Sequence, residues 1–310
     1  MQEFPTIIHR EPAAVQYFLG VKPYMATFKI ITDSCADLSA QQYAALDVVY
    51  TPLSVLLKGK LHDSFATDED NKMLYNALRD GEMPTTSAAN PETWANTMRP
   101  ILDEGKDILV LAFSSALSTT YQSAVIAAQE LIDEYPDRKI NVVDSLCAAL
   151  GQGLLVWYAC QKRDEGMTLE QVTDWVEDNK LYICHWVTVD DLFHLKRGGR
   201  VSAATAAVGT MLNIKPIIHV NDEGKLINVG KARGRKAAMD ILLKKYAELA
   251  TDNETVFIGH GDCLEDAQIL EKALKEKHGV KNIHIGYVGG VIGAHTGPGV
   301  LVIFFLGSHR

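Results

Sequence analysis

The sequence contains little cysteine, and none of it is arranged as metal sites or disulfide frameworks usually are. Five of the 310 residues are cysteine, and no Cys-x-x-Cys pair occurs. A scattered and odd-numbered set argues against a structural zinc site or a disulfide scaffold, and it fits a reducing compartment. We therefore expect a cytoplasmic protein without a bound metal.

The sequence also lacks an excess of positive charge and a long hydrophobic run. It has 30 Lys and Arg residues against 39 Asp and Glu, a formal net charge of −9. This balance argues against a general nucleic-acid binder, which needs basic residues facing phosphates. The apolar run at 300–306 is far too short to span a bilayer, and the N-terminus has no signal-peptide pattern. We expect neither a nucleic-acid partner nor an integral membrane segment.

Several common catalytic motifs are missing. The chain has no Gly-x-Ser-x-Gly, no His-Glu-x-x-His and no Gly-x-x-x-x-Gly-Lys-[Ser/Thr]. The pair Gly151-x-Gly153 lacks the third glycine of a dinucleotide fingerprint and does not directly follow a predicted strand. At 47% hydrophobic residues, the chain can bury one large core or two smaller ones.

The first half of the chain alternates between predicted strands and helices, which favours a parallel sheet with helices on both faces. Strands are predicted at 28–32, 48–57 (interrupted by Pro52), 108–113 and 139–143. Helices are predicted at 38–46, at 68–79, after Pro91, at 122–129 and at 151–162.

The second half predicts a mixed sheet, because a hairpin signal at 222–225 joins two strands. Strands are predicted at 182–189, 214–220, 226–231, 255–259, 283–288 and 300–306. Helices are predicted at 168–179, 203–212, 234–250 and 264–277, with loops at 191–201 and 289–299. We expect an N-terminal extension at 1–27, an N-terminal α/β domain at 28–178 and a C-terminal α/β domain at 179–310.

A run of hydroxyl side chains lies between the buried strand at 108–113 and the helix behind it. It contains Ser114, Ser115, Ser118, Thr119 and Thr120. Open α/β sheets bind ligands at the carboxyl ends of their strands, and helix starts favour anions. The alternative is a plain helix start, with Ser118 or Thr119 as N-cap and a capping box of Thr119 and Gln122.

Other loops offer further candidates. A second hydroxyl loop is predicted at 84–87, and His295 lies in a glycine-rich loop where a ligand could reach it or where it could serve structure alone. Asp33, Ser34 and Asp37 are better explained as caps of a turn and a helix start than as a metal site. A basic cluster without acids follows the hairpin, where a phosphate or an acidic partner could bind: Lys225, Lys231, Arg233, Arg235 and Lys236.

Taken in order, these loops resemble the DegV family of bacterial fatty-acid-binding proteins over about residues 28–307. The matching segments are Asp33-Ser-x-Ala-Asp37, Pro84-x-Thr86-Ser87, Ser114-Ser-x-Leu-Ser118-x-Thr-Tyr121-x-Ser-Ala124, Val143-Asp-Ser145, Lys196-Arg-Gly-Gly-Arg200-Val, Arg233-Gly-Arg235-Lys and His295-Thr-Gly-Pro-Gly299. One departure is Thr119, where the family usually has glycine.

The resemblance implies two α/β domains with a long-chain fatty acid between them and no other cofactor. Ser118 and Thr86 would hold its carboxylate, with Ser115 and His295 close by. In the family's fatty acid kinase systems the bound acid is presented to a separate kinase subunit, which makes an acyl phosphate. The resemblance therefore makes Arg233, Arg235 and Arg200 candidates for partner or phosphate contact.

Two other functions stay open from the sequence. A serine-dependent hydrolase or acyltransferase would use Ser118 as nucleophile and His295 as base, but the sequence shows no nucleophile elbow and no orienting acid. A partner-binding regulator would carry the lipid only as a structural element. We expect a non-catalytic carrier.

Overall fold

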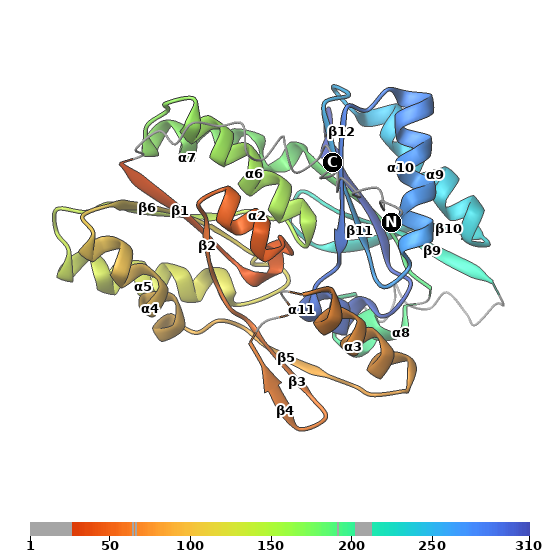
Figure 1. The fold of residues 1–310 in the computed structure, drawn as a ribbon, viewed down its shortest axis with the longest axis horizontal. Helices are drawn as coiled ribbons and strands as arrows, with labels where there is room; N and C mark the ends of the chain where they lie inside the picture. Colours follow the sequence, from red (N-terminus) through yellow and green to blue (C-terminus); the bar gives the residue numbers. More distant parts are fainter. Residues whose placement is uncertain (1–26, 64, 66, 191, 202–212) are drawn as a thin grey trace, which may run out of the picture.

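The computed structural model describes residues 27–63, 65, 67–190, 192–201 and 213–310. Figure 1 shows two groups of strands and helices side by side, with a small sheet projecting from one end. The extension predicted at 1–27 lies outside the described residues except for residue 27. The helix predicted at 203–212 lies wholly outside them.

A parallel sheet occupies the N-terminal half, in the strand order β2-β1-β6-β7. Helices cover both of its faces: α4 and α5 lie below the sheet in Figure 1, and α6 and α7 lie above it. This confirms the predicted parallel sheet. The strands are β1 (Phe28–Asp33), β2 (Val49–Thr51), β6 (Asp107–Ala112) and β7 (Ile140–Asp144). The helices are α4 (Pro91–Asp103), α5 (Thr120–Glu134), α6 (Leu150–Asp164) and α7 (Leu169–Asn179).

A mixed sheet occupies the C-terminal half, in the order β10-β9-β8-β13-β11-β12. The β9–β10 hairpin is antiparallel as predicted, whereas β11 and β12 run parallel. Helices α9 and α10 pack on this sheet, and α6 also contacts it. The strands are β8 (Ile183–Thr188), β9 (Ile214–Val220), β10 (Leu226–Arg233), β11 (Thr255–His260), β12 (Asn282–Tyr287) and β13 (Leu301–Leu306). The helices are α9 (Arg235–Leu249) and α10 (Leu264–His278), and a 3-10 turn, η2 (Lys180–Tyr182), precedes β8.

Helix α6 contacts both main sheets, which explains its apolar sequence. It touches β1 and β6 of one sheet and β8, β11 and β13 of the other. A helix that is apolar all round is a buried helix. A Cβ at residue 151 would lie 2.2 Å from His185 Nε2, and one at residue 153 would lie 2.5 Å from the Ala36 carbonyl oxygen. Gly151 and Gly153 are therefore needed for close packing on both sides of α6.

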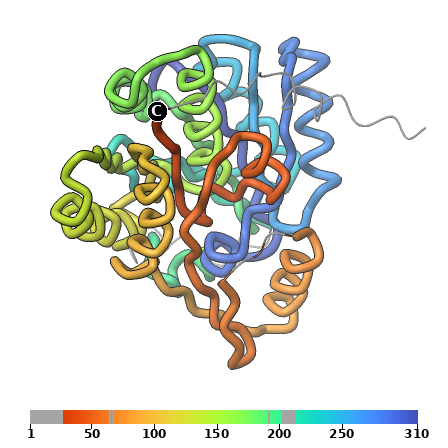
Figure 2. Tube along the Cα trace, turned by 60° about the vertical axis from the view of Figure 1, so that its left-hand side comes forward, coloured from red at the N-terminus to blue at the C-terminus, as the bar shows by residue number. Residues whose placement is uncertain are grey.

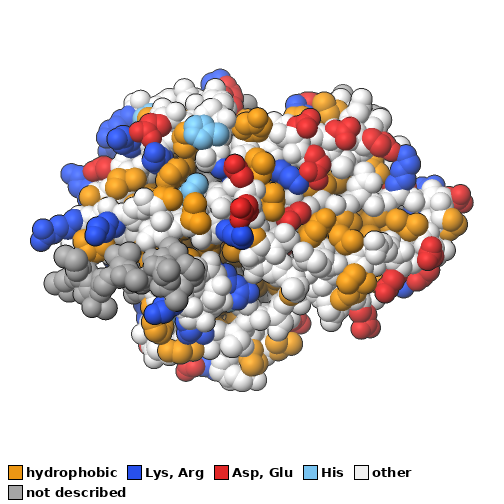
Figure 3. All heavy atoms as spheres, turned by 180° about the vertical axis from the view of Figure 1, so that it is seen from behind, with side chains coloured by type: hydrophobic (Ala, Val, Ile, Leu, Met, Phe, Trp, Pro, Cys, Tyr) orange, Lys and Arg blue, Asp and Glu red, His pale blue; other side chains and the backbone are white. Residues whose placement is uncertain are grey.

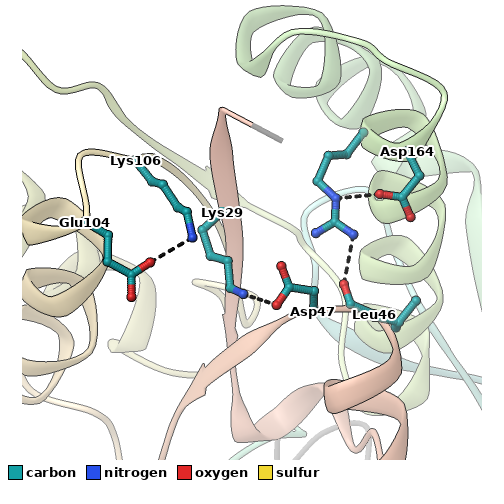
Figure 4. A network of polar contacts seen from close by, with 7 residues as sticks. Lys29, Leu46, Asp47, Glu104, Lys106 and Asp164 are labelled. Carbon is teal, nitrogen blue, oxygen red and sulfur yellow. Dashed lines mark hydrogen bonds and ion pairs between the residues drawn. The ribbon is translucent and has the colours of Figure 1, made fainter. Parts of the chain in front are cut away.

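Hydrogen bonds join the C-terminal end of α6 to the turn after α2 (Ala40–Ala45), as Figure 4 shows. The Arg163 guanidinium donates to the Leu46 carbonyl oxygen at 2.9 Å and to Asp164 at 2.8 Å. Beside it, Lys29 on β1 pairs with Asp47. These contacts satisfy Arg163, which is almost fully buried, because a buried charge without partners would be costly.

A small antiparallel sheet, β4-β3-β5, was not expected as a separate unit. It comprises β3 (Ser54–Leu57), β4 (Lys60–His62) and β5 (Thr85–Ser87), with α3 (Asp68–Arg79) between β4 and β5. The prediction of a loop at 84–87 was wrong, because this segment pairs with β3, Thr86 opposite Val55. A three-residue polar strand carries no hydrophobic pattern from which pairing could be predicted.

Two further predicted loops contain short helices, α8 (Phe193–Arg197) and α11 (Gly290–Thr296). In α11, a Cβ at residue 290 would lie 2.1 Å from the Phe65 ring, and one at residue 293 would lie 2.7 Å from the Tyr75 hydroxyl. The glycines of α11 therefore allow close packing of the helix against its neighbours. In the sequence alone, the same glycines indicate a loop. His295 lies near the end of this helix.

Candidate functional site

A cavity of about 450 Å³ lies where the loops after β6 and β7 meet the mixed sheet. Apolar side chains from β8, β9, β10 and β13 form much of its wall, including Val187, Ile218, Val220, Leu226 and Val302. Ala148 and Ala149 line it from the loop between β7 and α6. We call it the first cavity.

The hydroxyl run predicted after β6 divides into two groups in the structure. Ser115, Ser118 and Thr119 line the first cavity. Ser114 is buried and its Oγ donates to the Gly224 carbonyl oxygen at 2.9 Å, which ties the end of β6 to the β9–β10 hairpin. Thr120 is also buried, with its Oγ1 2.8 Å from Ser118 Oγ.

The capping box predicted for Thr119 and Gln122 is wrong. Thr119 precedes α5 but makes no side-chain cap hydrogen bond. Instead, the Thr120 N–H donates to Ser118 Oγ at 3.3 Å. The φ of Thr119 is −80°, an ordinary value, so a residue with a side chain fits here without backbone strain.

Two other predicted site residues meet on the same cavity wall. Thr86 comes from β5 and His295 from α11, and Thr86 Oγ1 lies 2.8 Å from His295 Nε2. Burial, together with the charges of Arg200 and Arg197, lowers the pKa of His295 to about 4. The imidazole is therefore neutral near pH 7. Its Nδ1 is buried and has no hydrogen-bond partner among the described residues.

Arg200 lines the first cavity beside these polar groups. It follows α8, and its Nε donates to the Leu117 carbonyl oxygen at 3.3 Å. Burial lowers its pKa somewhat from the usual value, but a guanidinium stays charged in proteins. Among the described residues that line the cavity, Arg200 supplies the one fixed positive charge, and no Asp or Glu lines it.

His185 on β8 also lines the cavity, and the sequence reading missed it. Its Nδ1 lies 2.8 Å from the Ile183 carbonyl oxygen, and its Nε2 accepts the Ala148 N–H at 3.2 Å. Burial lowers the pKa of His185 well below its ordinary value. Because both ring nitrogens make hydrogen bonds, His185 is a neutral part of the cavity wall. A single histidine in an apolar strand carries no sequence pattern from which this position could be predicted.

The basic cluster does not behave as one uniform surface. Arg235 pairs with Asp266 at 2.8 Å and contacts the Cys263 sulfur, so a local acid that the sequence reading overlooked compensates it. Lys225 pairs with Glu223. Lys231, Arg233 and Lys236 are exposed. Figure 3 shows Lys and Arg side chains gathered at the edge of the molecule formed by β10 and α9.

Of the acids in the first loop, Asp33 caps a turn as the sequence indicated, whereas the start of α2 is capped by Ser39 and not by Asp37. Asp33 Oδ1 accepts the Cys35 N–H at 3.0 Å and thereby caps η1 (Ser34–Ala36). Its Oδ2 accepts the Phe113 N–H at 2.7 Å, which fixes the loop leading to Ser115. No cluster of three or more His, Cys, Asp or Glu suited to a metal ion occurs among the described residues. In the same part of the chain, no helix combines the length and apolar character needed to cross a membrane.

Comparison with known proteins gives consistent matches. A family model described as "Uncharacterised protein, DegV family" matches residues 27–308. A DegV domain-containing protein of Clostridium perfringens is 46% identical over 289 residues, which are 92% of this chain and 99% of that protein. These matches confirm the resemblance drawn from the ordered motifs.

Solved structures share the fold. A DegV family protein from Thermus thermophilus, described by its fatty acid binding, aligns with a TM-score of 0.80 at 32% identity, covering 89% of this chain and 98% of that one. A stearic acid-binding protein from Eubacterium ventriosum aligns with a TM-score of 0.81 at 26% identity, covering 89% and 97%. Both neighbours therefore bind fatty acids on a similar two-domain α/β fold.

Proposed function

The chain belongs to the DegV family, and from this premise we propose that it carries a long-chain fatty acid between a domain at 28–178 and a domain at 179–310. The carboxylate lies among Ser118, Thr86, Ser115 and His295, and the tail lies along the apolar walls of the first cavity. We place this carrier in the cytoplasm, in keeping with its scattered free cysteines.

The observation that carries the proposal is the uneven polarity of the first cavity. Its polar lining consists of hydroxyls, histidines and one guanidinium, and no described lining residue is acidic. Hydroxyls and a guanidinium can donate to a carboxylate, and charge-assisted hydrogen bonds are the stronger kind. The tail contributes roughly 0.8 kcal/mol per buried methylene before the costs of association.

Arg200 takes a different role in this proposal from the one its sequence position suggested. The sequence made it a candidate for contact with a partner or a phosphate, together with Arg233 and Arg235. Its place on the cavity wall supports a direct contact with the fatty acid carboxylate. The neutral imidazole of His295 would then hydrogen-bond the same head group without adding a charge.

The carrier presents its acid to a separate fatty acid kinase subunit, which makes the acyl phosphate. The exposed Lys231, Arg233 and Lys236 supply a docking or phosphate-contact surface for that partner. Arg235 has a smaller part in this surface, because Asp266 already neutralises it. A contact of this kind would weaken as salt concentration rises, because exposed charges are screened.

Native mass spectrometry of the purified protein, followed by identification of the extracted ligand, tests the proposal. We expect one fatty acid per chain on the wild type and less on Ser118→Ala. A protein that is empty and takes up no added fatty acid would contradict the carrier. Purified kinase with ATP should then form an acyl phosphate only when the loaded carrier is present.

The second candidate, a Ser118 hydrolase, is weakened by the geometry. Ser118 Oγ contacts Thr120 Oγ1, while His295 Nε2 contacts Thr86 Oγ1. An activated serine needs its base within hydrogen-bond reach and an acid behind that base. Turnover of an acyl ester, or an acyl adduct on Ser118, would revive this function. A regulator with purely structural lipid would keep its partner binding after the lipid is removed.

A further inference from the structure

A second cavity, of about 260 Å³, adjoins the first, and Leu53 and Val291 line both. One side of it comes from η1, α2 and the start of α3. The other side comes from β12 and the segment that leads into α11. Figure 2 shows α3 beside α11, where the two halves of the chain meet. We call this the second cavity.

Two buried oxygen atoms on its wall have no hydrogen-bond partner among the described residues. They are Asn71 Oδ1 and Asp37 Oδ2. Asn71 is 5% exposed, and its Nδ2 donates to the carbonyl oxygens of Phe65 and Thr67 at 3.1 and 3.0 Å. These two bonds fix the orientation of the amide, so Oδ1 is the atom left without a donor. Buried acceptors without partners are rare and costly.

The second cavity contributes no positive charge of its own. No Lys or Arg occurs among the described residues that line it. Gln42 Oε1 accepts the Ser39 N–H, so Gln42 Nε2 donates to His284 Nε2 at 3.0 Å. Burial lowers the pKa of His284 to about 4, which keeps it neutral. Burial raises the pKa of the Asp37 carboxyl well above its ordinary value, against the Gly289 N–H that donates to it and with Asp33 adding to the rise. An ammonium ion bound at Oδ2 therefore takes the place of the carboxyl proton.

Aromatic residues line the same cavity as these acceptors. The Tyr43 and Tyr50 rings lie 4.5 Å apart between centroids, and Phe65 and Tyr287 line the same cavity. Carboxylate and amide oxygens next to aromatic faces are the combination that binds organic ammonium groups. The volume exceeds by far the ~30 Å³ share of one water molecule, so the space suits an organic ion better than a bare metal ion.

We propose that the second cavity binds a small organic molecule with a primary ammonium group, whose N–H donors reach Asp37 Oδ2 and Asn71 Oδ1. The site is separate from the fatty acid site. Its occupancy can therefore be tested whether or not the first cavity holds a lipid.

n-Propylammonium, with n-propanol as its neutral counterpart, is the probe for the wild-type protein. Crystals soaked in n-propylammonium chloride should show the nitrogen about 3 Å from both oxygens. Calorimetric titration should give an affinity at least tenfold higher for the ammonium ion than for the alcohol. Ordered water alone at the two oxygens, or equal affinities for the two probes, would overturn the proposal.

A matched pair of variants separates a specific contact from general charge. Asp37 has φ of +54°, a left-handed conformation that Asn also tolerates, so Asp37→Asn should keep the fold. We expect it to bind n-propylammonium at least tenfold more weakly. Glu69→Gln makes the same carboxyl-to-amide change at an exposed site on α3 that does not line the cavity, and it should bind normally.

Unchanged binding in Asp37→Asn, or an equal loss in both variants, would contradict the assignment. Circular dichroism and thermal unfolding check that both variants fold. If Asp37→Asn does not fold, the comparison of the two probes on the wild type still decides.

Discussion

The two cavities share a wall and differ in the polar groups they offer. The first cavity combines apolar surface with hydroxyls and the Arg200 guanidinium, and no described lining residue is acidic. The second offers carboxylate and amide oxygens, and no described lining residue is Lys or Arg. On the two proposals above, this contrast in donors and acceptors favours an anionic ligand in the first cavity and a cationic ligand in the second. The predictions below test the first member of this pair.

Reducing the room for the tail should have the largest effect. Val220 lines the first cavity and is 1% exposed. Val220→Phe should displace several methylenes, and about four of them at roughly 0.8 kcal/mol each correspond to about a two-hundredfold loss of affinity. The loss should grow with acyl chain length in a fluorescence displacement series.

Val229→Phe on β10 is the matched control, because Val229 is 49% exposed and does not line the cavity. It should bind fatty acids normally. An equal loss for short and long acids in Val220→Phe would show that the tail does not occupy this space.

Removing the positive charge at the head group should have the next largest effect. Arg200→Met loses charge-assisted hydrogen bonds, worth about 1.5–3 kcal/mol, or roughly 10- to 100-fold in affinity. Arg233→Met removes an exposed charge outside the cavity and should leave fatty acid binding unchanged while it lowers the rate of acyl phosphate formation.

Isothermal titration with a long-chain fatty acid measures the first effect, and a coupled kinase assay measures the second. Normal fatty acid affinity in Arg200→Met would contradict a contact with the carboxylate. It would favour the contact with a partner or a phosphate that the sequence resemblance suggested for Arg200.

Deleting one neutral hydroxyl should have a moderate effect. Ser118→Ala removes a hydrogen bond of about 1 kcal/mol, which corresponds to roughly a fivefold loss of affinity. Ser123→Ala, on the helix that follows Ser118 but outside the cavity lining, is the control and should bind normally. Parallel displacement titrations compare the two. Equal fatty acid affinities in Ser118→Ala and Ser123→Ala would show that Ser118 does not bind the carboxylate.

The last prediction concerns a different quantity, the pH dependence of stability, and not a change in fatty acid affinity. Because burial lowers the pKa of His295 from 6.5 to about 4, folding favours the neutral ring. That contribution is present above pH 6.5 and is lost as pH falls toward 4. Lipid-free His295→Gln should therefore lose less stability over this range than the wild type does.

Urea denaturation at several pH values measures the difference between wild type and variant. The difference is the quantity to follow, because burial raises the pKa of Asp33 to about 6, and that group acts with the opposite sign. The exposed His309→Gln is the control and should behave as the wild type. A variant with the full wild-type pH dependence would contradict the burial of a neutral His295.

Much of the fold could be predicted from local patterns. Alternating buried strands and amphipathic helices predicted both main sheets. The helices predicted after Pro91 and at 168–179 are present, with Asn90 and Thr168 as their N-caps. The three-residue β5 and the helix α11 were missed because their formation depends on distant partners. Thr86 pairs with Val55, and Gly290 packs against Phe65.

The site was predicted less completely, for a similar reason. Ordered loop motifs predicted Ser118, Thr86, Ser115 and His295 as carboxylate contacts; that role stays a prediction, and all four residues line the first cavity. The exposure of Arg200 to the same cavity depends on how the segment after α8 folds back toward Leu117. No sequence spacing encodes that contact, nor the acid that neutralises Arg235.

A crystal structure of the protein with a bound long-chain fatty acid tests the central claim most directly. The account predicts one acid in the first cavity, its carboxylate about 3 Å from the Arg200 guanidinium and the Ser118 hydroxyl, and its tail along β8, β9 and β13. A carboxylate at the opposite end of the cavity, or an acid bound elsewhere on the protein, would contradict it.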